Sequence, residues 1–267
     1  MNVLVGDNME IWLHFLLFAI PGFLIYYGLY YLTPKLVKKG VPLIFAFWSC
    51  LWIPVIALLP LAISLADVID GMELSRSAVV ERFHLHPLRG SDWLWVGGAV
   101  IATILLDQLL EPIGKYFARK KAFAPPPYLP APFNPLHKFT FPPHDFFGVK
   151  LAGNWKLLLL FIPLHLVAMF SEEMMWRGFL LPLQVAIFGD LAWVLNGLLW
   201  AWIVHACLKW HFVGMLPSML IAPFIAQLTG STLASFFVHA IPNSLLWIIL
   251  LLGIIQKKDN QMNTPIS

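Results

Sequence analysis

The sequence predicts an all-α protein that crosses a membrane several times. Its composition is 60% hydrophobic and only 12% charged, with a mean hydropathy of +0.78, whereas soluble domains carry about 25% charged residues. Apolar runs of about twenty residues recur, which is the length that a helix needs to cross a bilayer. The runs lack the strand-like alternation of a membrane barrel, and a helix satisfies its own backbone groups in lipid. We therefore predict a polytopic transmembrane helical bundle.

Residues 1–124 are expected to contain three spans joined by charged segments. Apolar runs of sufficient length place these spans at about residues 11–32, 41–66 and 93–113. Pro54 and Pro60 are expected to kink the second span, which neighbouring helices can tolerate. Residues 67–91 form a mixed-charge connector that includes the stretch ERFHLHPLRGSDW. We expect this connector to lie at the membrane interface.

Residues 125–154 are predicted to form a proline-rich cytoplasmic loop, because prolines from Pro125 to Pro143 prevent a continuous helix. The helical core follows over residues 155–255. Its four expected spans bring the total to about seven, within a range of six to eight; they lie at about residues 155–181, 190–208, 211–227 and 232–255. Pro182 is expected to end or kink the first of these. Residues 256–267 are polar, and we expect a disordered tail.

The distribution of basic residues predicts the orientation of the bundle. The loops after the first and third spans, the link near Lys209, and the tail with Lys257 and Lys258 are basic. The N-terminal segment contains Asp7 and Glu10 but neither lysine nor arginine. Because basic loops stay on the cytoplasmic side, we expect the N-terminus outside and the C-terminus in the cytoplasm.

The stretch SEEMMWRGF, residues 171–179, places charged groups inside a very apolar region. Such groups are costly in a span and are functional candidates by default. In a helix, Glu173 lies four residues before Arg177 on one face, which is the favourable order for an ion pair. Glu172 is rotated by about 100° from Glu173. We interpret Glu173 as paired with Arg177 and Glu172 as available for chemistry, although a purely structural ion-pair network is the simpler alternative.

Three further polar residues are expected at compatible depths. At 1.5 Å per helical residue, Glu172 lies about 14 Å inward from the outer face, His205 about 22 Å and His239 about 10 Å. Asn243 follows His239 by one turn and projects the same way. One cavity in the outer-to-middle part of the membrane can therefore contain all four. Taken singly, His205 can also be a core histidine, and His239 with Asn243 an interhelical clasp.

This set of groups is suited to hydrolysis. A carboxylate in an apolar cavity can act as a general base, and an imidazole across the cavity can hold the attacking water. Imidazole and carboxamide donors can stabilise a tetrahedral oxyanion. The sequence offers no serine or cysteine in a nucleophile-elbow context. We therefore favour activated water as the nucleophile.

These residues resemble the signature of the CPBP family of intramembrane endopeptidases, which includes CAAX prenyl proteases and bacteriocin-processing or self-immunity (ABI-like) proteins. The signature is E-E-x-x-x-R, then F-x-x-x-H, then H-x-x-x-N. The first and third motifs are complete here, as Glu172, Glu173, Arg177, His239 and Asn243. The second retains His205 but has Ala201 in place of the phenylalanine, with Trp200 and Trp202 beside it. The resemblance covers roughly residues 155–250, and ERFHLHPLRGSDW resembles the segment that often precedes this core.

The resemblance implies roles for these residues. Glu172 would be the general base, His205 the water-positioning partner, and His239 with Asn243 the oxyanion stabilisers, with Glu173 and Arg177 supporting the site. Whether a divalent metal takes part stays open; a zinc ion would have Glu172, His205 and His239 as ligands.

The implied substrate is a peptide or a lipid-modified or membrane-associated protein, in contact with membrane lipids and without nucleic acid. The implied location is the bacterial plasma membrane. Two alternatives stay open, namely a proteolytically inactive immunity or scaffold protein and a proton-coupled transporter. The lack of an internal repeat counts against the transporter.

Overall fold

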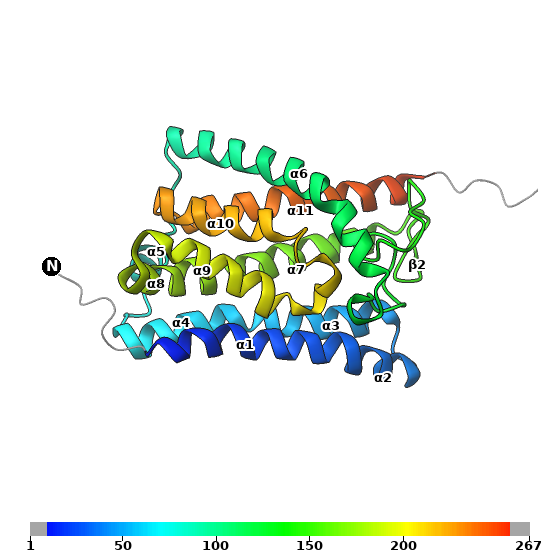
Figure 1. The fold of residues 1–267 in the computed structure, drawn as a ribbon, viewed down its shortest axis with the longest axis horizontal. Helices are drawn as coiled ribbons and strands as arrows, with labels where there is room; N and C mark the ends of the chain where they lie inside the picture. Colours follow the sequence, from blue (N-terminus) through cyan, green and yellow to red (C-terminus); the bar gives the residue numbers. More distant parts are fainter. Residues whose placement is uncertain (1–9, 257–267) are drawn as a thin grey trace, which may run out of the picture.

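The computed structural model describes residues 10–256, and it confirms the predicted all-α class. Long helices run side by side along the long axis of the molecule (Figure 1). Within residues 10–256, the strands are limited to the antiparallel pair β1 (Asp145–Phe146) and β2 (Val149–Lys150). By length and composition, five segments are able to cross a membrane: Ile11–Lys38, Leu43–Asp70, Gly90–Ala118, Trp155–Val204 and Thr232–Ile255.

The first span is longer than predicted. Helix α1 (Ile11–Tyr27) continues through the π-helical segment Gly28–Leu32 into α2 (Thr33–Lys38). Pro34 does not stop it; this residue lies at the start of α2, directly after the π-helical segment.

The second span consists of two helices. Helix α3 (Leu43–Ile56) gives way to α4 (Leu58–Asp70) at Ala57, three residues after Pro54. The expected irregularity is therefore present at this point. Pro60 lies in the first turn of α4, where the helix continues undisturbed.

The connector after α4 is shorter than expected and contains a helix. Gly71 adopts a left-handed backbone conformation (φ 63°), which ends α4. Helix α5 (Arg76–Arg82) then begins, with the Ser75 hydroxyl accepting a hydrogen bond from the Ala78 amide at 3.2 Å. The third span, α6 (Gly90–Ala118), starts and ends several residues beyond its predicted limits.

The proline-rich segment is irregular, as predicted, but it folds against the bundle instead of extending from it. After the short 3₁₀ helix Lys121–Phe123, the chain packs buried aromatic rings onto the helices. The Phe147 ring lies 4.4 Å from that of Phe47 in α3. The Gly153 amide donates to the Ile254 carbonyl at 2.9 Å. The apolar composition of the segment explains the difference, because these rings gain free energy by leaving water.

The helical core folds back on itself at Gly189. Helix α7 (Trp155–Glu173), the π-helical segment Met174–Leu180 and α8 (Leu181–Phe188) form one continuous rod. The helix does not end at Pro182, as one form of the expectation had it, because Pro182 lies at the start of α8 and the helix continues to Phe188. Gly189 then turns the chain with a positive φ of 57°.

The return path is shorter than predicted. Helix α9 (Ala192–Leu199) and the π-helical segment Trp200–Val204 end before His205, and the 3₁₀ helix Ala206–His211 follows. Helices α10 (Leu216–Thr229) and α11 (Thr232–Ile255) complete the core. The predicted limits of α11 are correct. The predicted tail, residues 256–267, lies outside the described residues except for Gln256.

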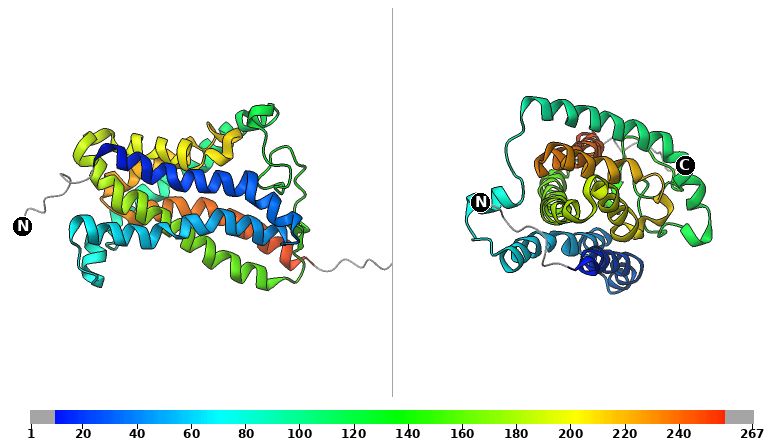
Figure 2. Two further views of the ribbon diagram at one scale, coloured as in Figure 1. Left: turned by 90° about the horizontal axis from the view of Figure 1, so that it is seen from below. Right: turned by 60° about the vertical axis from the view of Figure 1, so that its left-hand side comes forward.

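The helices form three layers, and the helical core is the middle layer, with one layer of helices on each side (Figure 2). Helix α6 packs on α10 and α11 at one side, and α3 packs on α7 at the other. Helix α1 packs on the π-helical segment Trp200–Val204. The middle layer of α7, α9 and α11 therefore carries the three motifs, and both outer layers shield it.

Lysines gather at one end of the bundle. Helix α2, the last turn of α6 and the proline-rich segment lie at this end (Figure 1), and their basic residues include Lys38, Lys115 and Arg119. The opposite end carries the acids Asp70 and Asp190 together with the arginines of the connector, Arg76, Arg82 and Arg89. The basic residues of the first end are the basis of the predicted orientation, which itself stays a prediction.

Close packing at Gly197 gives a testable consequence for stability. A methyl group at this position of α9 would lie 2.5 Å from the Met219 carbonyl oxygen of α10. We predict that Gly197→Ala lowers the free energy of unfolding by about 1–3 kcal/mol, because neither backbone can yield without strain. The control Gly98→Ala lies in α6 with open space around it, and stability there should be unchanged or slightly higher. Thermal unfolding of the purified protein measures both; equal effects would contradict the packing described here.

Candidate active site

Four of the predicted site residues line one cavity. Glu172, His205, His239 and Asn243 surround a space of about 180 Å³. The remaining walls are mainly apolar and come from the first span, α3, α7, the proline-rich segment and the 3₁₀ helix Ala206–His211, among them Ile25, Leu29, Phe47, Trp52, Val55, Leu129 and Phe133. Because the lining includes Leu129 and Phe133, the cavity reaches the end of the bundle that carries the proline-rich segment. It is therefore not confined to the outer-to-middle depth expected from helix lengths.

Helix geometry changes directly beside the two key residues of this cavity. The glutamate pair ends α7 at the start of the π-helical segment Met174–Leu180. His205 follows the π-helical segment Trp200–Val204 and has non-helical backbone angles (φ −94°, ψ 22°). A π-helical turn shifts the direction of the side chains that follow it, and such turns occur frequently at functional sites. Neither π-helical segment was predicted from the hydrophobic pattern.

Glu172 contacts two side chains at the cavity wall. It is 6% exposed, and its Oε1 accepts a hydrogen bond from Trp200 Nε1–H at 3.0 Å. The same oxygen lies 3.9 Å from His205 Nε2, which is beyond hydrogen-bonding distance. The carboxylate is therefore oriented by one donor and faces an imidazole across a small gap.

The protonation of His205 follows from its backbone contact. Its Nδ1 lies 3.1 Å from the Trp200 carbonyl oxygen. A carbonyl oxygen can only accept, so Nδ1 carries the hydrogen. In the neutral ring, Nε2 is then an acceptor. Two acceptors, Glu172 Oε1 and His205 Nε2, thus face each other.

Glu173 lies behind the cavity wall and is fully buried. Its carboxylate accepts from Ser235 Oγ at 2.5 Å and lies 2.9 Å from His239 Nδ1. The predicted ion pair is present, with 3.4 Å between Arg177 Nε and Glu173 Oε2. Unlike Glu172, this acid has its oxygen atoms engaged by several partners and lacks access to the cavity.

His239 and Asn243 enter the cavity from α11. His239 Nδ1 is engaged by Glu173, so Nε2 is the atom that remains for a ligand. Asn243 Nδ2 donates to the His239 carbonyl at 2.9 Å. This amide nitrogen carries two hydrogens, and the contact uses one of them. Pro242 between the two residues lacks an N–H and interrupts the ladder of α11.

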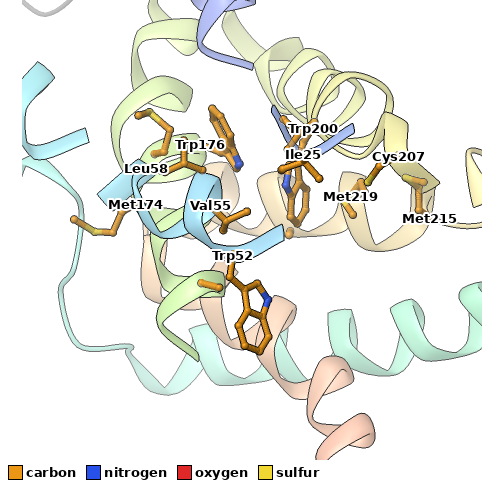
Figure 3. Close-up of a cluster of buried hydrophobic side chains, with 14 of the residues drawn as sticks. Ile25, Trp52, Val55, Leu58, Met174, Trp176, Trp200, Cys207, Met215 and Met219 are labelled. Carbon is orange, nitrogen blue, oxygen red and sulfur yellow. The ribbon is translucent and has the colours of Figure 1, made fainter. Parts of the chain in front are cut away.

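Trp200 is the site residue that the sequence reading missed. Its ring lies 3.7 Å from the Arg177 guanidinium carbon, 5.4 Å from the His205 ring and 5.1 Å from the His239 ring. Figure 3 shows Trp200 within the buried cluster formed with side chains of α1 and α3. Ala201, which replaces the family's phenylalanine, is buried beside it. The adjacent tryptophan therefore supplies an aromatic ring at the site, and the incomplete second motif was the signal that pointed to it.

The connector before α6 fixes the segment that carries Arg177. Arg82 donates from Nη1 to the Gly178 carbonyl at 3.0 Å and pairs with Asp70 at 2.5 Å. Its guanidinium also lies over the Phe179 ring at 4.9 Å. A side chain at Gly178 would meet Phe83 at 2.9 Å. The stretch ERFHLHPLRGSDW thus holds the π-helical segment in place from outside the cavity.

Glu172, His205 and His239 are the residues that would bind a zinc ion. Within residues 10–256, no group of three or more histidine, cysteine, aspartate or glutamate side chains lies close enough to hold a metal ion. His205 Nδ1 and His239 Nδ1 are both engaged by protein groups, which leaves the two Nε2 atoms for a ligand. Metal-binding imidazoles usually have their other ring nitrogen held in this way, and a zinc ion here stays a proposal.

The fold and the site define a class of protein. A polytopic helical bundle encloses a carboxylate, two imidazoles and an amide in a largely apolar cavity, which are the parts of an intramembrane hydrolase. Residues 154–245, about a third of the 267 residues, match the family model described as Type II CAAX prenyl endopeptidase Rce1-like. The matched range includes the residues of both complete motifs and His205, confirms the predicted resemblance to the CPBP family and supports an intramembrane endopeptidase in general. Comparison with curated proteins and with solved structures gave no significant match.

Proposed function

We propose that this protein is an intramembrane endopeptidase that uses water activated by Glu172. The observation that carries the proposal is the shared cavity of Glu172, His205, His239 and Asn243. Hydrolysis of an amide requires a base, a held water and an oxyanion site near one another. These side chains supply each part from three different helical segments.

The opposed acceptors favour a water molecule between them. Glu172 Oε1 and neutral His205 Nε2 cannot bond to each other directly at 3.9 Å. A water molecule donating one hydrogen to each satisfies both acceptors and directs its lone pairs away from them. The water is then oriented for attack on a carbonyl carbon in the cavity.

The proposed hydrolysis proceeds by direct attack of water, without a covalent enzyme intermediate. The water oxygen bonds to the carbonyl carbon as Glu172 takes the water proton, and a tetrahedral oxyanion forms. Asn243 Nδ2–H donates to that oxyanion, and His239 does so from Nε2 when its ring is fully protonated. The C–N bond then breaks, and Glu172 returns the proton to the leaving amine.

The cavity lining supports a membrane-associated peptide or protein as substrate. Its walls are mainly apolar side chains, and hydrophobic and aromatic linings of this kind bind apolar ligand groups. Glu172 and the imidazoles are the polar exceptions. A water-soluble, charged substrate would lose hydration here without compensating partners.

A cleavage assay tests the proposal. The purified protein in proteoliposomes is incubated with a mixture of apolar synthetic peptides, and mass spectrometry detects new termini. We expect discrete products. A folded protein that yields no products from soluble, membrane-bound or lipidated peptides would contradict the proposal and favour the inactive immunity or scaffold alternative. Parallel samples with a chelator address the metal: the glutamate-only form of the proposal predicts undiminished cleavage.

Trp200 gives a second prediction for the same assay. Trp200→Phe keeps an aromatic ring against Arg177 but removes the donor to Glu172. A hydrogen bond to a charged group contributes about 1.5–3 kcal/mol, so we expect the cleavage rate to fall by about 10- to 100-fold. The matched control is Trp202→Phe, whose indole is exposed and donates to the Phe212 carbonyl. Equal rates in wild type and Trp200→Phe would show that Trp200 does not orient the base.

A further inference from the structure

Phe133 borders three adjoining hollows at the loop end of the bundle. It lines the catalytic cavity. It also lines a groove of about 420 Å³ between the proline-rich segment and α11, which we call the α11 groove. The third hollow, of about 220 Å³, lies between the same segment, α6 and the 3₁₀ helix Ala206–His211.

The wall between the catalytic cavity and the α11 groove is thin. Two residues, Phe133 and Asn243, line both spaces. Asn243 is the proposed oxyanion donor, so the groove begins where a scissile bond would lie. Beyond it, Phe139, Pro242, Leu246 and Ile249 provide apolar walls. Glu111 at the rim is paired with Lys115 at 2.8 Å, which leaves the groove with little net charge.

An endopeptidase must hold chain on both sides of the scissile bond. Asn243 lines both the catalytic cavity and the α11 groove. The chain on one side of a scissile bond held beside Asn243 can therefore continue into the α11 groove.

The Phe133 ring is held in place by neighbouring aromatic rings. Its ring contacts those of Phe47, Phe146 and Phe147 at 5.9–6.1 Å between centroids. All three partners are buried, at 1–4% exposure. A ring packed in this way defines a fixed boundary, because moving it would break several aromatic contacts.

We propose that the α11 groove binds an extended, apolar stretch of the substrate polypeptide on one side of the scissile bond, and that Phe133 determines the size of the residue accepted next to it. This inference rests on the proposed endopeptidase function. Its occupant is polypeptide, because the groove adjoins the catalytic cavity at Asn243, beside the place where a peptide bond must lie. A lipid acyl chain in the groove is the competing outcome.

Opposite substitutions at Phe133 test the inference. Wild type, Phe133→Ala, Phe133→Leu and Phe133→Trp, as full-length protein in proteoliposomes, are given a synthetic peptide mixture randomised on both sides of the cleavage site. We expect Ala and Leu to shift the preference on one side toward larger residues by about tenfold or more, and Trp to shift it toward smaller ones. The control Phe224→Ala, on α10 and away from the cavity, should keep the wild-type preference.

A second variant tests the groove itself. Leu246→Trp fills the α11 groove from α11, and we expect a higher KM with little change in kcat, because only ground-state binding is lost. Cleavage with unchanged residue preference in all Phe133 variants would refute this inference and leave the proposed function standing. A photoreactive phospholipid that labels the groove and is not displaced by cleaved peptide would also refute it. If folded wild type cleaves nothing, the inference fails together with the proposed function.

Discussion

Replacing Glu172 by glutamine is expected to lower the rate of peptide cleavage by about 10²–10⁴-fold, the usual contribution of a general base. Glutamine keeps the shape of the side chain, and its amide oxygen still accepts the Trp200 hydrogen bond. It cannot take a proton from water. The loss should therefore appear in kcat, while thermal stability stays close to that of wild type.

Two further variants serve as comparisons for Glu172→Gln. Glu73→Gln changes an exposed acid far from the cavity and should leave the rate unchanged. His205→Phe keeps an aromatic ring but removes the second acceptor for the water, so it should be slower than wild type but retain the base. If Glu172→Gln cleaves as fast as Glu73→Gln, Glu172 is not the base and another group must activate the water.

Removing the charge of Glu173 is expected to have the largest effect on stability. Glu173 and Arg177 are both buried, with 0% and 1% of their surface exposed. Glu173→Leu leaves the guanidinium in the core without its counter-charge. Breaking a buried pair in this way costs about 3–5 kcal/mol of the free energy of unfolding. Thermal unfolding of the purified variant measures the loss.

A double variant distinguishes the effect of the unpaired charge on stability from the effect of lost side-chain packing. Glu173→Leu with Arg177→Leu removes both charges, so it should be more stable than Glu173→Leu alone. Lys115→Met breaks the exposed pair with Glu111, and we expect a change of at most about 1 kcal/mol. A double variant less stable than the single one would show that the guanidinium is held by Trp200 and not by Glu173.

Most of the fold could be predicted from hydrophobicity alone. Long apolar runs specify helices in a bilayer, and the limits of α11 were predicted correctly from the length of its apolar run. The predictions are wrong where contacts between distant parts of the chain determine the structure. The helix continues past Pro182, and the proline-rich segment folds because its phenylalanines find a surface to bury against.

The candidate site was likewise predicted in part from the sequence. Spacing predicted the Glu173–Arg177 pair, and the motifs predicted which residues share a cavity. The link between His239 and Glu173 could not be predicted, because it joins residues 66 positions apart on two helices. Trp200 and the π-helical segments depend on local backbone geometry, which hydrophobic periodicity does not report.

The most direct test of water attack assisted by Glu172 is a single turnover in H₂¹⁸O with a peptide that the wild type cleaves. The account predicts one ¹⁸O atom in the new carboxyl group of the product and no label in the Glu172 carboxylate. Label in Glu172, or a trapped acyl group on any side chain, would contradict it, because either result requires a covalent intermediate.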